Sequence, residues 1–212
     1  MHPAFGLLVA YIAGSFPAAY LAGRLLKGVD LRKAGSGNLG ATNVYRNLGA
    51  PAALFVLALD VAKGALPVRF LPAVLHAGVA GEDAALWWAL AYGVAAIIGH
   101  AKPVFLLWRG GGKGVATAVG VFAAVVPGAV ASVVVLCTAV VWYSGYMSVG
   151  AVVASVAFPF IVWLDRGVSP VLWVSMGVSL FICWTHRTNY QRLRAGTEQR
   201  LFGRSGAEES GS

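Results

Sequence analysis

The chain has 212 residues, of which 58% are hydrophobic and 11% are charged, and its net formal charge is +8. Soluble domains carry about 25% charged residues, so this composition excludes an ordinary soluble domain and indicates an integral membrane protein. The basic excess is then explained by Lys- and Arg-rich cytoplasmic loops, and nucleic-acid binding is not expected.

Apolar segments long enough to cross a bilayer recur along the chain, and no long polar linker divides them. We expect one all-α polytopic membrane domain over residues 1–200 and a disordered tail over residues 201–212. The expected spans cover residues 5–26, 52–70, 84–99, 115–126, 129–143, 149–164 and 168–184. Counting the short segment 115–126 gives about seven transmembrane helices, whereas merging it with its neighbour gives fewer.

The distribution of basic residues favours seven spans, with the N-terminus outside and the C-terminus in the cytoplasm. In that topology only Arg69 and Arg166 lie on the outer side. The cytoplasmic side receives all the other basic residues assigned to loops: Arg24, Lys27, Arg32, Lys33, Arg46, Lys102, Arg109, Lys113, Arg187, Arg192, Arg194, Arg200 and Arg204. Three polar stretches of the chain would therefore share the cytoplasmic face.

Three features interrupt the apolar pattern of the first two spans. Gly14 and Pro17 break the first span and are expected to kink it, and residues 67–83 are expected to form a mixed loop. Asp60 and Lys63 lie three residues apart within the second span, where they can pair with each other toward the bundle interior. Such a pair is compatible with either a structural or a functional role.

The first polar stretch, residues 35–49, reads GSGNLGATNVYRNLG. Glycines at three positions allow positive φ and close backbone approach, so that successive N–H groups can line an anion-binding concavity. The other members are neutral donors and one guanidinium suited to phosphate. The predicted anion-binding residues are Gly35, Ser36, Gly37, Asn38, Gly40, Thr42, Asn43 and Arg46. The alternative is an ordinary interhelical loop.

The second polar stretch, residues 99–114, ends in a glycine run and Lys113 directly before an expected helix. A helix N-terminus carries free N–H groups and favours phosphate. The run lacks the Ser or Thr of a Walker A loop and follows no strand, so nucleotide hydrolysis is not expected. His100, in the same stretch, fits either a ligand contact or a satisfied histidine at the membrane interface.

The third polar stretch covers residues 186–198. On a helix, His186 and Asn189 would share one face, with Arg192 close to it. A basic helix that touches anionic lipid is the alternative. Acyltransferase HxxxxD patterns, GxSxG elbows and two-histidine zinc helices are missing from the sequence, and Cys137 and Cys183 are interpreted as small buried hydrophobic residues.

Taken together, these stretches resemble the membrane-integral bacterial glycerol-3-phosphate acyltransferases that use acyl phosphate as the donor. The family signatures GSGNxGATNxxR, GHxxPxFLxFxGGKGVAT and HxxNxxRLxxGxE read here GSGNLGATNVYR, GHAKPVFLLWRGGGKGVAT and HRTNYQRLRAGTE, in the same order. The resemblance spans nearly the whole chain. Trp108 and Arg109 replace the usual aromatic–lysine pair, and one additional glycine lengthens the run before Lys113.

The resemblance implies transfer of an acyl group from acyl phosphate to the sn-1 hydroxyl of glycerol-3-phosphate. The products would be lysophosphatidic acid and inorganic phosphate, in the first step of phospholipid synthesis. It further implies a multi-pass protein of the bacterial inner membrane, with its site facing the cytoplasm and with lipid around it. Because an acyl phosphate is already activated, neither a cofactor nor a metal is expected. We also expect the protein to be a monomer.

The resemblance also implies which residues line the site. Ser36, Arg46, Lys113 and His186 are the expected catalytic residues. The expected substrate- and phosphate-binding residues are Gly35, Gly37, Asn38, Gly40, Thr42, Asn43, His100, Gly111, Gly112, Gly114, Thr117, Ser148, Asn189, Arg192 and Glu198. One phosphate is assigned to the loop of residues 35–46 and the other to the surroundings of Lys113. The proton of the attacking hydroxyl would pass either to His186 or, as we favour slightly, to a substrate phosphate.

Two other functional classes remain as alternatives. A transporter of a phosphorylated solute would also need anion-binding loops, but its polar groups should gather near the membrane midplane on broken helices. A non-catalytic lipid-binding scaffold would need basic loops but no glycine-rich anion sites, so replacing Gly37 or Gly111 by alanine should leave it unaffected.

Overall fold

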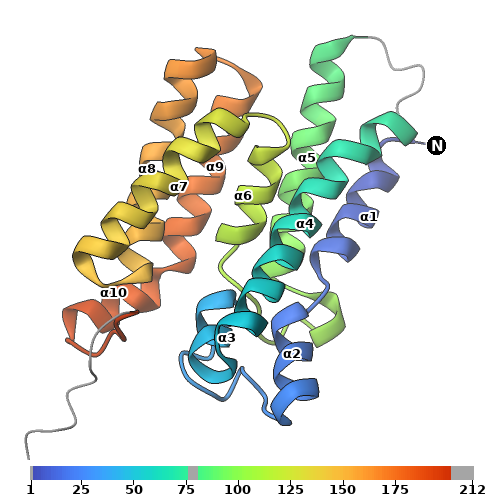
Figure 1. Cartoon of the computed structure of the whole chain (residues 1–212). Helices are drawn as coiled ribbons and strands as arrows, with labels where there is room; N and C mark the ends of the chain where they lie inside the picture. Colours follow the sequence, from blue (N-terminus) through green and yellow to red (C-terminus); the bar gives the residue numbers. More distant parts are fainter. Residues whose placement is uncertain (1, 76–80, 202–212) are drawn as a thin grey trace, which may run out of the picture.

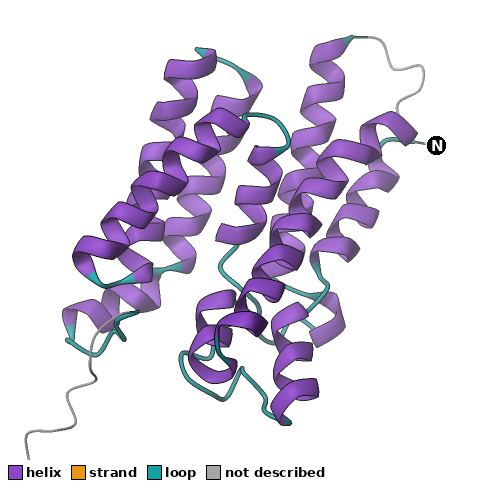
Figure 2. Cartoon of the chain, viewed as in Figure 1, coloured by secondary structure: helices purple, strands orange, loops and turns teal. Residues whose placement is uncertain are grey.

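The computed structural model describes residues 2–75 and 81–201, and within these residues the chain consists of helices joined by loops, with no strand (Figure 2). The helices stand side by side in a bundle (Figure 1). Their bounds are α1 Ala4–Gly14, α2 Ala18–Lys27, α3 Ala41–Leu48, α4 Ala50–Leu75, α5 Glu82–Ala101, the 3-10 turn η1 Val104–Leu106, α6 Val115–Ala123, α7 Pro127–Ser144, α8 Met147–Arg166, α9 Pro170–Thr185 and α10 Arg187–Arg194. The all-α prediction is confirmed for this part of the chain.

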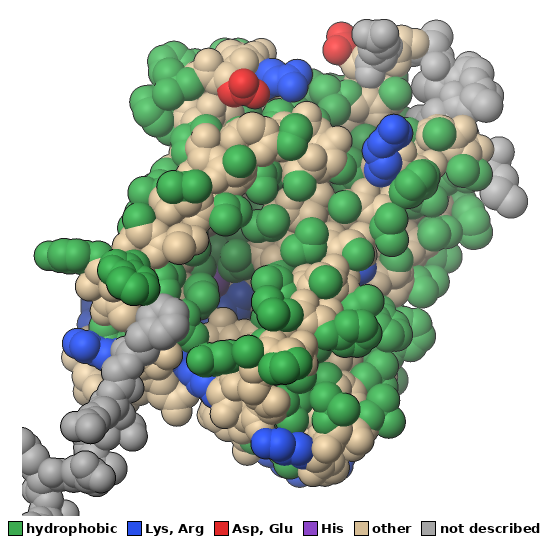
Figure 3. All heavy atoms as spheres, in the orientation of Figure 1, with side chains coloured by type: hydrophobic (Ala, Val, Ile, Leu, Met, Phe, Trp, Pro, Cys, Tyr) green, Lys and Arg blue, Asp and Glu red, His purple; other side chains and the backbone are tan. Residues whose placement is uncertain are grey.

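Four helical stretches of the described residues are long and apolar enough to cross a membrane: Ala4–Lys27, Asp83–Leu106, Pro127–Ser144 and Met147–Arg166. Pro170–Thr185 is a shorter apolar helix. The 26-residue α4 has sufficient length, but it carries Asp60, Lys63 and Arg69. The outer flanks of the bundle are covered by hydrophobic side chains, as expected of a surface that faces lipid (Figure 3).

Two expected loops are in part helical. The expected mixed loop over residues 67–83 is wrong for residues 67–75 and 82–83, since α4 continues through Pro67 and Pro72 to Leu75 and α5 begins at Glu82. Packing against neighbouring helices lets a membrane helix tolerate the missing proline N–H groups. Residues 76–80 of that expected loop and residues 202–212 of the expected tail lie outside the described residues.

The first polar stretch also becomes helical in its second half, where α3 forms. Gly40 has an extended backbone and serves as the N-cap of α3, and Val44 is fully buried in the middle of the helix. Val44 packs in a small core with Leu31, Leu39 and Val56. Burial of apolar side chains on one face therefore stabilises a helix here, although the stretch is rich in glycine.

Glycines let two pairs of helices approach closely. A Cβ added to Gly14 of α1 would lie 2.1 Å from the carbonyl oxygen of Ala96 in α5. A Cβ added to Gly64 of α4 would lie 2.2 Å from the carbonyl oxygen of Thr117 in α6, and one on Gly120 would lie 1.9 Å from that of Val61. Small residues at such crossings bring backbones together in membranes. The short helix α6 is therefore held firmly against α4, which fixes the segment that precedes it.

Lys and Arg side chains gather at one end of the bundle, the lower end in Figures 1 and 3, where α2, α3 and α10 lie. The opposite end shows both acidic and basic side chains on the face drawn in Figure 3. All three polar stretches meet at the basic end through direct hydrogen bonds between them, as the sequence predicts.

Candidate active site

Two hydrogen bonds join the three polar stretches, and a further one connects the first stretch to the segment just after the third. The backbone N–H of Leu39 donates to the carbonyl oxygen of Gly111 at 3.2 Å, which connects the first stretch to the second. Nζ of Lys113 donates to Oδ1 of Asn189, which connects the second to the third. Nη2 of Arg46 donates to the carbonyl oxygen of Gln199 at 2.8 Å, which connects the first stretch to the segment after α10.

Asn43 organises the loop that precedes it. Its Nδ2 donates to the carbonyl oxygens of Leu31 and Ala34, both at 3.1 Å, and its Oδ1 accepts the backbone N–H of Ser36 at 3.0 Å. Gly35 and Gly37 adopt positive φ values of 58° and 73°, as a tight turn requires. Gly40, which was expected to need the same freedom, is extended instead. The side chain of Asn43 is thus fully engaged by protein atoms.

The glycine run of the second stretch lies against the C-terminal end of α5. A Cβ added to Gly111 would lie 2.1 Å from the carbonyl oxygen of Ala101, and one added to Gly112 would lie 1.8 Å from Nε2 of His100. Gly114, with φ of 86°, is the N-cap of α6. Lys113 therefore immediately precedes a helix N-terminus, as predicted, and Oγ1 of Thr185 donates to its carbonyl oxygen at 3.1 Å.

Glu198 accepts hydrogen bonds from two side chains of the third stretch and from Ser148 in α8. Its Oε1 accepts from Nδ2 of Asn189 at 2.6 Å and from Oγ of Ser148 at 2.8 Å. Its Oε2 accepts from Nε of Arg192 at 2.7 Å. Burial raises the pKa of this carboxyl, but the hydrogen bonds from Arg192, Asn189 and Ser148 outweigh it and hold the pKa below its usual value. Glu198 is therefore an anion that orients three donors.

Lys113 occupies a strongly perturbed environment. Burial, with smaller contributions from the positive charges of Arg192 and Arg46, lowers the pKa of Lys113 to about 8, although Glu198 opposes the shift. Burial also lowers the pKa of Arg46. Lys113, Arg46 and Arg192 are half-buried cations, and among the described residues Glu198 is the carboxylate beside them, an arrangement that an incoming anion would stabilise.

His186 joins α9 to α10 and is 3% exposed. Burial and the charge of Lys113 lower the pKa of His186 to about 4, so the ring is neutral near pH 7. Nδ1 lies 2.8 Å from the carbonyl oxygen of Ile182, and a carbonyl can only accept. The ring proton therefore resides on Nδ1, which leaves Nε2 as a hydrogen-bond acceptor.

Sequence reasoning missed one charged group at the edge of the site. Arg32 pairs with Asp30 at 2.7 Å, and its Nη1 donates to the carbonyl oxygen of Arg109 at 3.3 Å. The hydrogen bonds and charge of Arg32 lower the pKa of Asp30 to about 2, against the effect of burial. The pair thereby connects the segment before the first glycine-rich loop to the second loop. Its signal in the sequence is the DLR motif just before residue 35.

Two predicted binding residues lie away from the Lys113–Glu198 network. Thr117 is fully buried beneath Gly64 of α4, and Oγ1 of Thr117 has no hydrogen-bond partner among the described residues. His100 is 6% exposed and lies 3.6 Å from Asp60, which pairs with Lys63 as predicted. Cys137 and Cys183 are free thiols that are only half-buried, so their interpretation as buried residues is too strong.

The space-filling view shows a recess beside this network, between the part of the bundle containing α7, α8 and α10 and the part containing α3 and α4 (Figure 3). Basic and histidine side chains are visible inside it, while hydrophobic side chains surround its upper rim. A recess of this kind can admit a molecule with a polar head and an apolar tail from the side of the bundle.

The chain is similar to known glycerol-3-phosphate acyltransferases. Residues 4–196 match the family model described as glycerol-3-phosphate acyltransferase. A glycerol-3-phosphate acyltransferase of Synechococcus sp. (strain CC9902) is 44% identical over 195 residues, which is 92% of this chain and 93% of the relative.

Two crystal structures of PlsY, an integral membrane glycerol 3-phosphate acyltransferase, share the fold. The glycerol 3-phosphate form has a TM-score of 0.84 and 35% identity, covering 95% of this chain and 96% of that chain. The lysophosphatidic acid form has a TM-score of 0.80 and 34% identity, covering 95% of each chain.

Proposed function

The chain belongs to the glycerol-3-phosphate acyltransferase family, and from that premise we propose that it moves a fatty acyl group from an acyl phosphate to the sn-1 hydroxyl of glycerol 3-phosphate. The products are lysophosphatidic acid and inorganic phosphate. The observation that carries the proposal is the convergence of Arg46, Lys113 and Arg192 around one carboxylate, with glycine-rich backbone beside them. Both substrates bring a phosphate to such a site, which oriented cations and N–H groups stabilise.

The reaction needs little from the protein besides orientation and charge. The hydroxyl oxygen of glycerol 3-phosphate attacks the carbonyl carbon of the acyl phosphate, an ester bond forms, and the bond from that carbon to the phosphate oxygen breaks. Lys113 and Arg46 stabilise the negative charge that develops on the leaving phosphate. Since the acyl group arrives activated, we propose that neither a metal nor a covalent acyl-enzyme takes part.

A substrate phosphate accepts the hydroxyl proton in this scheme. A ring whose pKa is about 4 is a weak base at neutral pH, whereas a phosphate monoester has its second pKa at about 6. General bases work best when their pKa lies near the operating pH. Nε2 of His186 instead accepts a hydrogen bond from the hydroxyl and orients it for attack.

We assign the other predicted residues by their contacts. Ser36, Asn38, Thr42 and the backbone of Gly35 and Gly37 surround one phosphate, while Gly114 and the donors Asn189 and Arg192 serve the other. Ser148, whose hydroxyl donates its hydrogen bond to Glu198, positions that carboxylate beside them. Asn43 and Glu198 hold these groups in place and do not contact the phosphates themselves, since protein partners satisfy the hydrogen bonds of both side chains. Thr117 supports the packing of α6 on α4.

The membrane arrangement follows from the basic end of the bundle. We propose seven crossings, formed by the α1–α2 segment, α4, α5, α6, α7, α8 and α9, in a monomer of the bacterial inner membrane. The N-terminus is outside and the site faces the cytoplasm, in agreement with the positive-inside rule. A transporter is disfavoured because the polar stretches gather at one end of the bundle rather than at its middle.

The decisive experiment measures phosphate release from palmitoyl phosphate by the purified protein in lipid, with and without glycerol 3-phosphate. Release by the wild type should require glycerol 3-phosphate and should collapse in Lys113→Ala. Lys102→Ala is the matched control, because Lys102 is an exposed lysine close to the same end of the bundle. Folded wild-type protein that releases no phosphate in any lipid would refute the proposed activity and favour the transporter.

A further inference from the structure

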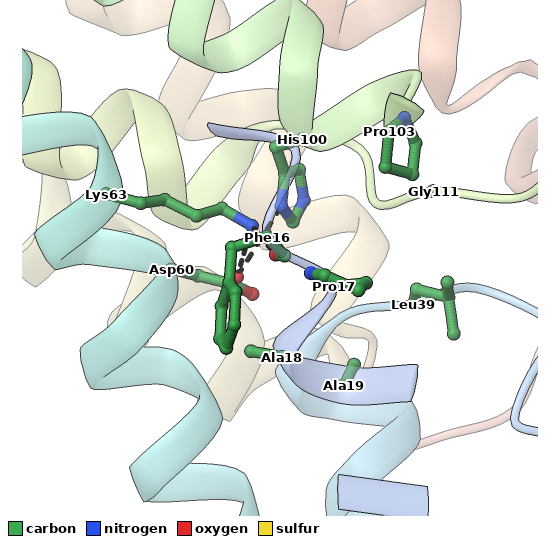
Figure 4. Close-up of a pocket in the computed structure, with 10 residues that line it drawn as sticks. All are labelled: Phe16, Pro17, Ala18, Ala19, Leu39, Asp60, Lys63, His100, Pro103 and Gly111. Atoms are coloured by element: carbon green, nitrogen blue, oxygen red, sulfur yellow. Dashed lines mark hydrogen bonds and ion pairs between the residues drawn. The ribbon is translucent and has the colours of Figure 1, made fainter. Parts of the chain in front are cut away.

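A buried ionic cluster lies beneath the glycine run and takes no part in the reaction scheme proposed above. Asp60 and Lys63, one turn apart on α4, pair at 2.8 Å, and Nδ1 of His100 on α5 lies 3.6 Å from the same carboxylate oxygen. The residues are 2%, 8% and 6% exposed, respectively. Figure 4 shows their side chains converging on one small cavity, which Gly111 also lines.

The cluster contacts the break between α1 and α2. Nζ of Lys63 donates to the carbonyl oxygen of Phe16 at 3.0 Å, in the segment where Pro17 separates the two helices. A carbonyl at a helix break inside a membrane protein needs a donor, and a buried ammonium needs acceptors. Lys63 therefore connects α4 to the helix break while it neutralises Asp60.

On its other side, the cluster contacts the glycine run through His100. The carbonyl oxygen of His100 accepts the backbone N–H of Gly112 at 3.1 Å. The ring of His100 packs directly on Gly112, because a Cβ there would lie 1.8 Å from Nε2. Lys113 is the next residue. Since Nδ1 of the ring lies toward Asp60 and Nε2 toward Gly112, the position of the carboxylate determines where the run can lie.

We propose that Asp60, Lys63 and His100 form a positioning unit that holds the run Gly111–Gly112–Lys113 in place for a substrate phosphate; this inference rests on the proposed function, in which Lys113 binds that phosphate. None of the three is a catalytic residue. At 3.6 Å the contact of His100 with Asp60 is electrostatic rather than a hydrogen bond. This electrostatic interaction is strong only because its surroundings are buried and have a low dielectric constant.

The competing explanation is that the ion pair serves folding alone. Replacing Asp60 by Asn leaves the ammonium of Lys63 buried without its carboxylate, which is strongly destabilising for a pair of this kind. Replacing both partners with Asp60→Asn and Lys63→Gln removes the unpaired charge and should restore much of the stability. The double variant still lacks the carboxylate that faces His100, so it separates folding from positioning.

The test measures thermal unfolding and the steady-state constants kcat and KM for glycerol 3-phosphate in the same lipid preparation. A displacement of about 1 Å in a binding group can cost about 100-fold in rate. We expect the double variant to unfold near the wild-type temperature while its kcat/KM falls by about 10- to 100-fold. Asp165→Asn is the control, since it breaks the exposed ion pair with Arg166 at 3.1 Å and should change neither quantity.

His100→Gln provides a second measurement that does not depend on the double variant. It should unfold near the wild-type temperature and show the same loss of kcat/KM. Recovery of both stability and kcat/KM in the double variant, or wild-type kcat/KM in His100→Gln, would overturn the positioning role. Wild-type protein without glycerol-3-phosphate-dependent phosphate release would instead refute the proposed function, so the two failures are distinguishable.

Discussion

Lys113 and Glu198 are joined through a single amide. Nζ of Lys113 donates to Oδ1 of Asn189, and Nδ2 of Asn189 donates to Oε1 of Glu198 at 2.6 Å. Because an amide is both an acceptor and a donor, it can connect a cation to an anion with the correct polarity at each end. The position of the ammonium is thereby coupled to a carboxylate in the segment that follows α10.

Replacing Asn189 with Asp should therefore disrupt the site more than its small change in shape suggests. The new carboxylate would lie at hydrogen-bond distance from Glu198, and two like charges so close cannot both remain ionised without a large cost. We expect glycerol-3-phosphate-dependent phosphate release to fall by at least about 100-fold, the scale associated with the loss of one preorganised donor. Thr188→Asp, at an exposed neighbouring position, is the control. Near-normal activity in Asn189→Asp would contradict the role of the amide.

The pKa of Lys113 predicts how substrate affinity depends on pH. Since burial lowers this pKa to about 8, the ammonium is charged below pH 8 and loses its proton as the pH rises through that value. We expect KM for glycerol 3-phosphate to increase as the pH is raised from about 7 to about 9.5, where a free lysine would still be charged.

Lys113→Arg tests the assignment of that dependence, because a guanidinium stays charged throughout this range. The variant should show lower activity overall and a KM that does not rise in the same way. A wild-type KM that is constant up to about pH 9.5 would show that the charge of Lys113 does not contribute to affinity.

His186→Gln should retain more activity than a missing general base would allow. Its side-chain oxygen can still accept a hydrogen bond from the substrate hydroxyl, and a substrate phosphate still takes the proton. We expect kcat to remain within about tenfold of the wild type, because the loss of a general base typically costs about 100- to 10,000-fold. A larger loss, with unchanged thermal unfolding, would make His186 the base.

Gly111→Ala should impair the site through its backbone. The added methyl group would lie 2.1 Å from the carbonyl oxygen of Ala101, which belongs to a helix and cannot move away like a flexible side chain. We expect a rise in KM of about tenfold or more, measured for glycerol 3-phosphate at fixed palmitoyl phosphate.

Gly177→Ala is the matched control for that substitution, because nothing lies within 4 Å of the position where its Cβ would be added. It should leave KM unchanged and increase helix stability slightly, by about 0.5–1 kcal/mol. Equal, wild-type behaviour of the two variants would favour a lipid-binding scaffold over an anion site.

Much of this architecture could be predicted from local sequence. The apolar segments indicate most of the helices, the glycine run marks the start of α6, and Asp60 and Lys63 pair because one helical turn separates them. The helical continuation past Pro67 could not be read in this way, since it depends on the neighbours of α4 rather than on its own residues. Likewise, α3 forms because Val44 finds a core supplied by other segments.

The partners of the site residues were harder to predict than their identities. The sequence predicts Glu198 as a binding residue, but not that Ser148, fifty positions earlier, donates to it. The sequence leaves His100 compatible with two roles and does not predict that its ring lies 3.6 Å from Asp60. Contacts between distant segments depend on how the helices pack, and periodicity within one segment carries no information about them.

The bond between Arg46 and Gln199 spans 153 positions of the chain. Arg46 is therefore synthesised well before its partner, since proteins are made from the N-terminus. A half-inserted chain can already contain α1 to α6 and the first glycine loop, yet it lacks Asn189, Arg192 and Glu198. The order of biosynthesis is thus itself a safeguard, because under the proposed function an acyl donor can meet a working site only after the residues up to Gln199 have been made.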